Sequence, residues 1–143
     1  MEEEFQGALD TEGVRKNFMF LNRKAPYGSI YAQEIQEMVL ISAAFEQNTS
    51  VVFIDDGVYQ IKKGQDTSFS GMKNFSPTYG IFQMEKEDAE EDEDEDIVWH
   101  IVVEKESMEA RGLSPEDLVI DVEVMDSAEL KKLMAEQDVI LTG

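Results

Sequence analysis

The sequence predicts an α/β fold, a three-layer sandwich in which a parallel sheet of about five strands lies between helices on both faces. Short apolar runs alternate along the chain with segments of helical periodicity, and this order favours parallel strands joined by right-handed crossovers. The run at residues 97–103 has almost no polar alternation, as expected of a strand covered on both faces. A length of 143 residues suits one domain with one core.

The first strand is expected at residues 17–21, where an apolar run has the length of a buried strand. A helix should follow over residues 30–45, with Ser29 as its N-cap and an apolar stripe at helical spacing. The last two turns of this helix, residues 38–45, are apolar nearly all round. Such a helix is buried on more than one side, either by this domain or by another subunit.

The middle of the chain is predicted to form a second buried strand at residues 51–54 and a short helix at residues 58–62. A long polar loop should follow over residues 64–76. The Ser-Pro step at the end of this loop can begin another helix, because proline is tolerated in a first helical turn. That helix should include residues 79–84 and then dissolve into an acidic run.

The last third of the chain is predicted to contain three strands and three helical segments. Proline just inside one segment is typical of a capped helix start, and Leu130, Leu133 and Met134 share one face of the final helix. In order, the expected elements are a strand at 97–103, a helix at 107–111 stopped by Gly112, a capped start at 114–117, a strand at 119–124, a helix capped by Ser127 and a strand at 138–141.

The domain organisation follows from polarity and charge. Residues 1–16 are polar and aperiodic and should form a flexible tail, whereas residues 17–143 should form a single domain. The run at 85–96 holds ten acidic residues and one lysine, and so contributes nine of the 20 net negative charges. Blocks of this kind are typically solvated insertions, although this one could recruit a basic partner.

Composition excludes several classes of function. A net charge of −20 argues against a broad nucleic-acid-binding surface, and no apolar run reaches the roughly 18 residues of a membrane helix. The chain starts with three glutamates after Met1 and lacks the pattern of a signal peptide, so a cytoplasmic location is expected. The absence of cysteine rules out a disulfide framework, a thiolate metal site and a thiol nucleophile.

Two loops at predicted strand ends could carry chemistry, since ligands of open parallel sheets bind beyond the carboxyl ends of the strands. The first loop brings Arg23 and Lys24 to a helix N-terminus, which suits an anion, or leaves them as solvated cations. The second places Asp55 and Asp56 before Gly57. These carboxylates could bind a metal or act as acid and base, or they could cap the next helix and start a turn.

The remaining chemistry-bearing residues favour structural roles. His100 is the only histidine and lies within an apolar strand, which indicates a packed, hydrogen-bonded residue of a core or interface rather than a general base. Ser29 and Ser76 stand near loop-to-helix junctions without a nucleophile-elbow pattern, so both are interpreted as caps. No cofactor is predicted.

Six segments stand out in order along the chain: Asn-Arg-Lys-Ala-Pro-Tyr-Gly at 22–28, Asp-Asp-Gly-Val-Tyr-Gln at 55–60, Gly-Gln-Asp-Thr at 64–67, Lys-Asn-Phe-Ser-Pro-Thr-Tyr at 73–79, Ser-Met-Glu-Ala-Arg-Gly-Leu at 107–113 and Asp-Val-Ile-Leu at 138–141. In this order they resemble the DsrF/TusC branch of the DsrE/DsrF-like sulfur-relay family. The similarity spans residue 17 to the C-terminus apart from the acidic run, and it is fuller with DsrF-type than with TusC-type sequences.

The resemblance implies a DsrE-like fold and a non-catalytic subunit that is not an enzyme on its own. Such a subunit would assemble with DsrE-like and DsrH-like partners into a hetero-hexamer holding two copies of each. The DsrE-like chain would carry the persulfide cysteine and pass sulfur to a small DsrC-like or TusE-like carrier during sulfur oxidation. Apolar and aromatic residues near the two strand-end loops give an expected subunit interface of Tyr27, Tyr31, Tyr59 and Phe75.

Three alternatives stay open at this point. A TusC-like subunit would serve a relay for tRNA 2-thiouridine formation, and the neighbouring genes would separate it from a sulfur-oxidation subunit. A free-standing protein that binds a small anion or nucleotide would use Arg23, Lys24, Asp55 and Asp56 in a sealed pocket. An interaction protein would lose its basic partner when residues 85–96 are deleted.

Overall fold

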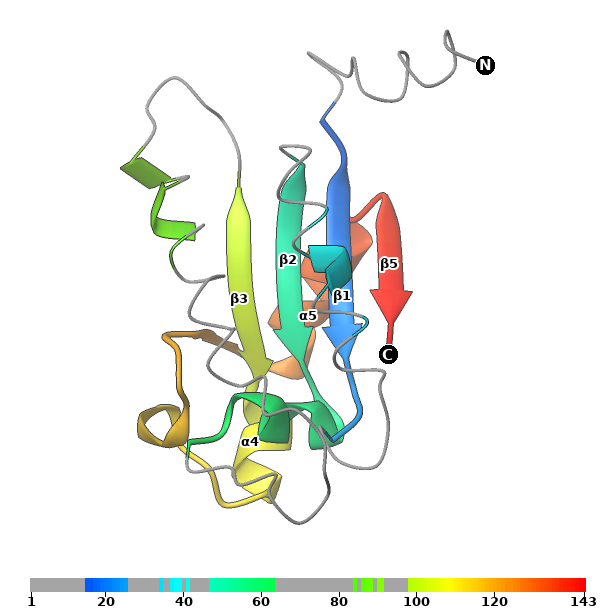
Figure 1. The fold of residues 1–143 in the computed structure, drawn as a ribbon. Helices are drawn as coiled ribbons and strands as arrows, with labels where there is room; N and C mark the ends of the chain where they lie inside the picture. Colours follow the sequence, from blue (N-terminus) through cyan, green and yellow to red (C-terminus); the bar gives the residue numbers. More distant parts are fainter. Residues whose placement is uncertain are drawn as a thin grey trace, which may run out of the picture.

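The computed structural model describes residues 15–25, 47–63 and 98–143, together with residues 34, 37–39, 41, 84, 86–88, 90 and 91. Five parallel strands form one sheet in the order β4-β3-β2-β1-β5 (Figure 1). The predicted α/β fold with a five-stranded parallel sheet is therefore confirmed. The strands are β1 Asn17–Asn22, β2 Asn48–Phe53, β3 Trp99–Glu104, β4 Glu123–Met125 and β5 Val139–Thr142.

The larger apolar cluster covers one face of the sheet. Phe20, Val51 and Ile101 lie side by side in register across β1, β2 and β3, and all three are almost fully buried. Val39 from the first helical segment packs on them, as does Met108 from the helix α4 (Lys105–Ala110). Because the strands alternate their side chains between the two faces, the neighbouring residues point to a second layer.

The second face is covered by the helix α5 (Ser127–Ala135), which crosses behind the sheet in Figure 1. Its residues Leu130 and Leu133 form a cluster with Met19, Leu21, Val52 and Val102. The chain thus crosses from β4 at one edge to β5 at the other edge over this face. The two faces together give the predicted three layers. Among the described residues, no helix has the length and apolar character needed to cross a bilayer.

Three strands lie within two residues of their predicted bounds, and the other two differ by more. β2 begins at Asn48 instead of residue 51, because its polar first residues are buried by neighbouring strands: Thr49 is 1% exposed. The strand expected at 119–124 is only Glu123–Met125. The backbone before it is bonded elsewhere, since the amide of Val119 donates to the carbonyl of Ile61 at 2.7 Å.

The helical segments also differ in detail. The helix expected at 58–62 is a 3-10 helix, η1 (Asp55–Ile61), and the capped start at 114–117 is a single 3-10 turn, η3 (Pro115–Asp117). α4 begins at Lys105 rather than at residue 107.

Residues of the acidic run continue a helix that was expected to dissolve there. Residues 84, 86–88, 90 and 91 are helical, and Lys86 lies 3.9 Å from Glu90 in an i,i+4 ion pair, a spacing that stabilises helices. Five other sequence predictions concern residues outside those described: the N-terminal tail before residue 15, most of the helix at 30–45, the loop at 64–76, the start of the helix at 79–84 and the last part of the acidic run.

Asp126, and not Ser127, caps α5. The Asp126 carboxylate accepts a hydrogen bond from the amide of Glu129 at 2.8 Å. Ser127 is the first residue of the helix, and its hydroxyl donates to the carboxylates of Glu106 and Glu104. The sequence prediction was wrong by one residue because both side chains are good N-caps.

Replacing Asp126 by Ala should therefore lower the free energy of unfolding by about 1 kcal/mol, the usual cost of losing an N-cap. The matched variant Ser127→Ala should cost less than about 0.5 kcal/mol, because its hydroxyl serves only partly exposed carboxylates. Urea unfolding of both variants measures the two losses. Equal losses would contradict the assignment of the cap.

The capping box at η3 lowers the pKa of the Asp117 carboxyl below its ordinary value. The cause is first the hydrogen bond from the Ser114 amide, at 2.9 Å, and then the bond from the Ser114 hydroxyl, at 3.1 Å, with a smaller contribution from Lys62 and Lys63. Both bonds favour the ionised carboxylate. The stabilisation is therefore present above the pKa of the unfolded chain and is lost as the pH falls through the lowered pKa.

Ser114→Ala should raise the titration midpoint of Asp117 toward the ordinary value of about 3.9, without reaching it, because the backbone amide still donates. The midpoint can be followed from the carboxyl carbon resonance by NMR. Glu116→Gln, in the same turn, provides a control that should leave the midpoint nearly unchanged. A midpoint unaffected by Ser114→Ala would show that the hydroxyl does not hold the carboxylate.

Candidate functional site

The candidate site lies beyond the carboxyl ends of β1, β2 and β5. There the surface has an open pocket of about 540 Å³, lined by Arg23, Lys24, Asp55, Asp56, Thr142 and Gly143. The two loops that the sequence singled out meet in this pocket, because β1 and β2 are adjacent parallel strands. The contribution of β5 was not predicted, although the order of strands explains it: β5 is the other neighbour of β1.

The turn after β2 is pressed against the end of β1. The amide of Ile54 donates to the carbonyl of Asn22 at 3.0 Å, and a Cβ on Gly57 would lie 1.9 Å from the same carbonyl oxygen. Asn22 is itself 1% exposed, and its side-chain amide donates to the carbonyls of Phe20 and Val52 at 3.2 Å each. The two loops are thus held together by backbone contacts, independently of the charged side chains.

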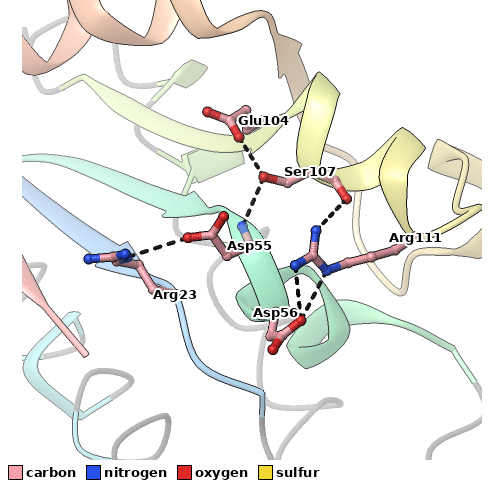
Figure 2. A network of polar contacts seen from close by, with 6 residues as sticks. All are labelled: Arg23, Asp55, Asp56, Glu104, Ser107 and Arg111. Carbon is pink, nitrogen blue, oxygen red and sulfur yellow. Dashed lines mark hydrogen bonds and ion pairs between the residues drawn. The ribbon is translucent and has the colours of Figure 1, made fainter.

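Asp55 has a left-handed backbone conformation, with φ of 49°. Aspartate is among the few residues other than glycine that adopt this region at modest cost. Its amide donates to the hydroxyl of Ser107 at 2.9 Å, and that hydroxyl donates to the carboxylate of Glu104 at 2.5 Å. Ser107 is 4% exposed, so α4 anchors the turn through a buried hydroxyl (Figure 2).

Both aspartates are paired with arginines (Figure 2). Arg23 Nε lies 3.5 Å from the Asp55 carboxylate. The Arg111 guanidinium donates to Asp56 from Nε at 3.1 Å and from an Nη at 3.0 Å, and its other Nη donates to the Ser107 carbonyl at 3.1 Å. These side chains are partly exposed, and exposed pairs of this kind stabilise by less than about 1 kcal/mol each. They orient side chains more than they stabilise the fold.

The two aspartates do not cap η1, as the sequence had suggested they could. The N-cap of η1 is Ile54, which makes no side-chain capping bond, and both aspartates belong to the first turn. Their carboxylates pair with arginine instead. The described residues include no group of three or more His, Asp and Glu side chains arranged to hold a metal ion.

Only some of the site residues predicted from the sequence lie together in the structure. Arg23, Lys24, Asp55 and Asp56 come together in the pocket. Tyr59 is half-buried in η1 and does not line it, while Tyr27, Tyr31 and Phe75 lie outside the described residues, as do Ser29 and Ser76. Sequence reasoning missed Ser107 and Arg111, which reach the loop from α4. The sequence indicated their position only indirectly: both follow the third strand, whose carboxyl end lies at the same edge of the sheet as the pocket.

His100 lies away from this pocket, near the amino end of β3. It is hydrogen-bonded, as predicted, because its Nδ1 is 3.1 Å from the Glu123 carboxylate of β4. Its side chain is 30% exposed, so it is only partly buried. It contributes nothing to the strand-end pocket.

Comparison with known proteins gives a consistent result over nearly the whole chain. The sequence model of the DsrE/DsrF-like family matches residues 16–142. The chain is 47% identical over 146 aligned positions to the intracellular sulfur oxidation protein DsrF of Allochromatium vinosum, which covers 90% of this chain and 97% of that protein. It is 34% identical to a TusC homolog of Vibrio vulnificus, over 80% of this chain and 88% of that protein.

A solved structure with the same fold is the ychN protein of E. coli. The two superpose with a TM-score of 0.70 over 91% of this chain and 100% of the other, at 19% sequence identity. At this level of identity the likeness concerns the fold alone.

The contact between Gly57 and Asn22 leads to a prediction about how the site is held. Gly57→Ala should lower the free energy of unfolding by about 2–4 kcal/mol, because the new methyl group meets a backbone carbonyl that cannot rotate away. Gly112→Ala is the matched control. Gly112 has a φ of 68° but open space around its Cβ position, so only the conformational cost of about 1 kcal/mol should appear.

Urea unfolding measures both losses, and the exchange rates of the Ile54 and Gly57 amides report whether the turn has moved away from β1. If Gly57→Ala cost no more than Gly112→Ala, the close approach would not be a feature of the folded protein.

Proposed function

The chain belongs to the DsrE/DsrF-like family, and we propose that it is a non-catalytic, DsrF-like subunit of a cytoplasmic sulfurtransferase complex. The observation that carries the proposal is 47% identity to a DsrF protein over nearly the full length of both chains. The complex would relay persulfide sulfur in sulfur oxidation. Its other members would be DsrE-like and DsrH-like chains in a hetero-hexamer, with a DsrC-like or TusE-like protein as the carrier.

The lack of cysteine among the 143 residues supports an accessory role. A persulfide is a sulfur atom attached to a cysteine thiolate, which is the reactive form of that side chain. This chain cannot hold one, and another subunit must supply the reacting thiol. The contribution of this subunit would then be to shape and shield the environment of the partner's cysteine.

Exposed apolar residues on the first helical segment support assembly with other subunits. Val39 is fully buried in the core, whereas Met38 is 42% exposed and Ile41 is 58% exposed. The sequence indicated that this part of the helix is buried on more than one side. The described part of the domain covers only one of those sides, so we assign the outer side to a partner subunit. Apolar residues at the centre of an interface stabilise it by leaving water.

The charges of the strand-end pocket favour a protein contact over a free anion. Arg23 and Lys24 share the pocket with two carboxylates, and Asp55 lies within ion-pair distance of Arg23. A small anion would have to compete with Asp55 and Asp56 for the cations. A protein surface can match both signs at once, and such complementarity gives specificity to an interface. We therefore place this pocket at or near a subunit contact.

The second candidate within the family is a TusC-like subunit of a relay for tRNA 2-thiouridine formation. The 34% identity to a TusC homolog supports it, but the 47% identity to DsrF favours sulfur oxidation. Gene neighbourhood separates the two, since a sulfite-reductase-type gene would accompany the first and a tRNA thiolase gene the second.

Native mass spectrometry of the chain co-expressed with its genomic neighbours tests the assembly. The expected result is a mixed hexamer that contains a cysteine-bearing DsrE-like chain. Ile41→Asp should weaken this hexamer by about tenfold or more, because it buries a carboxylate in an apolar contact. A lone monomer or homodimer beside soluble, unbound neighbours would sink the proposal.

Lys131→Ala provides the control for charge. It also makes the chain one unit more negative, and it lies on the exposed side of α5. It should leave the hexamer intact, and both variants should keep the circular dichroism spectrum and unfolding midpoint of the parent. Equal weakening by the two variants would assign the effect of Ile41→Asp to charge and not to the lost apolar contact.

A further inference from the structure

A second, smaller hollow lies at the opposite end of the sheet from the strand-end pocket. It has a volume of about 200 Å³ and sits at the amino ends of β1, β2 and β3, beside the end of α5. Neither the sequence motifs nor the similarities to known proteins assign anything to it. Its walls are Asn17, Asn48, Ser50, Val98, His100, Leu133, Glu136 and Gln137.

The hollow exists because a small residue stands between two large ones. Ser50 is paired in register with Met19 on one side and His100 on the other. Two residues further along β2, Val52 points to the same face and packs in the cluster formed with Leu130 and Leu133 of α5. α5 ends at Ala135, and Leu133 is its one apolar residue that lines the hollow.

One buried polar atom of this hollow has no partner among the described residues. Ser50, which is 4% exposed, adds a hydroxyl to the same wall. The side-chain oxygen of Gln137 is shielded from solvent and unpaired, while its nitrogen donates to the Leu133 carbonyl at 2.9 Å. A buried acceptor without a donor costs about 1–3 kcal/mol, so such groups usually meet a ligand or an ordered water.

The histidine in the wall offers a third acceptor. His100 Nδ1 lies 3.1 Å from a carboxylate oxygen of Glu123, and an ionised carboxylate can only accept. In the neutral form of the ring, the proton is on the Nδ1 that faces this carboxylate, and Nε2 is then an acceptor. No described residue is bonded to Nε2.

The other polar walls are already engaged. The Asn17 amide group donates to the Glu136 carbonyl at 3.0 Å, and that of Asn48 donates to the Asn17 side-chain oxygen at 2.8 Å. The Asn48 oxygen accepts from the amide of Val98 at 2.9 Å. The amide donors of Asn17 and Asn48 are therefore bonded to other residues of the wall, and the groups left to contact a ligand are acceptors.

The electrostatic field of the hollow also favours a group that carries positive charge. The lining residues include the Glu136 carboxylate and no lysine or arginine. The hollow also faces the carboxyl end of α5, which carries the negative end of the helix dipole. A cation that donates several hydrogen bonds matches this field, whereas an anion would be repelled.

We propose that this hollow is a binding site for a primary ammonium group. An ammonium carries three N–H donors and no acceptor, and the wall offers Ser50 Oγ, the Gln137 side-chain oxygen and His100 Nε2. The volume accommodates the group with a few attached methylenes. The ammonium is either that of a free small amine or that of a lysine side chain from another protein.

Titration of the full-length, nitrogen-15-labelled chain with n-butylammonium tests the site. The expected result is saturable shifts centred on the amides of Ser50, His100 and Gln137. Tetramethylammonium, which has the same charge but no N–H donor, should produce no saturable shift there. Ser50→Val, which fills the hollow and removes the hydroxyl, should weaken binding by about tenfold or more.

Thr49→Val is the matched control for that variant. It removes a hydroxyl from the neighbouring residue of β2, which lies outside the hollow, so it should leave the affinity for n-butylammonium unchanged. Glu136→Gln supplies a second variant at an exposed position where folding is not at risk. It should weaken n-butylammonium by a smaller factor than Ser50→Val, through loss of charge alone.

Repeating the titration with the assembled complex distinguishes a free amine from a lysine of a partner. If n-butylammonium still binds when partner subunits are present, a free amine is the ligand. If the partners abolish the shifts and Ser50→Val weakens assembly, a partner's lysine occupies the hollow. Absence of saturable shifts in the isolated chain, or equal binding by Ser50→Val, would overturn the proposal and leave a water-filled hollow.

Discussion

The contact between the turn after β2 and the last carbonyl of β1 is the constraint on which the rest of the strand-end region depends. A side chain larger than a hydrogen atom at position 57 would occupy the space of the Asn22 carbonyl. With glycine there, the turn lies against β1 and brings Asp55 within ion-pair distance of Arg23. The same turn then reaches the buried hydroxyl of Ser107. The ion pair between Arg23 and Asp55 and the hydrogen bond to Ser107 therefore depend on this backbone packing and do not produce it.

The two ends of the sheet are held by different chemistry. At the carboxyl end, arginine and aspartate side chains link β1, the turn after β2 and α4 across a partly exposed surface. At the amino end, the uncharged amides of Asn17 and Asn48 join the beginnings of β1, β2 and β3 with the end of α5. Ion pairs in water weaken with added salt, whereas hydrogen bonds between uncharged amides depend on it much less. Added salt should therefore weaken the contacts at the carboxyl end of the sheet more than those at the amino end.

The fold class could be predicted from sequence because apolar runs mark buried strands, and all five strands were found. Their starts and ends could not be predicted where a polar residue is buried by a distant one. β2 begins with Asn48, Thr49 and Ser50, which are covered only once neighbouring strands are in place. Conversely, Leu118 and Ile120 are buried without belonging to β4. The four charged residues of the site were predictable from strand ends, but Arg111 and Ser107 were not, because their position depends on how α4 packs under η1.

The left-handed backbone of Asp55 also bears on how variation at this position should be interpreted. Asparagine and glycine adopt the same conformation readily, but a β-branched residue does so only at a large cost. Natural substitution at position 55 would therefore be confined to a few residue types even if its carboxylate contacted nothing. A narrow range of residues there in related proteins would record the shape of the chain and would not by itself indicate a role in sulfur chemistry. Position 56, whose backbone carries no such restriction, is the more informative of the two aspartates.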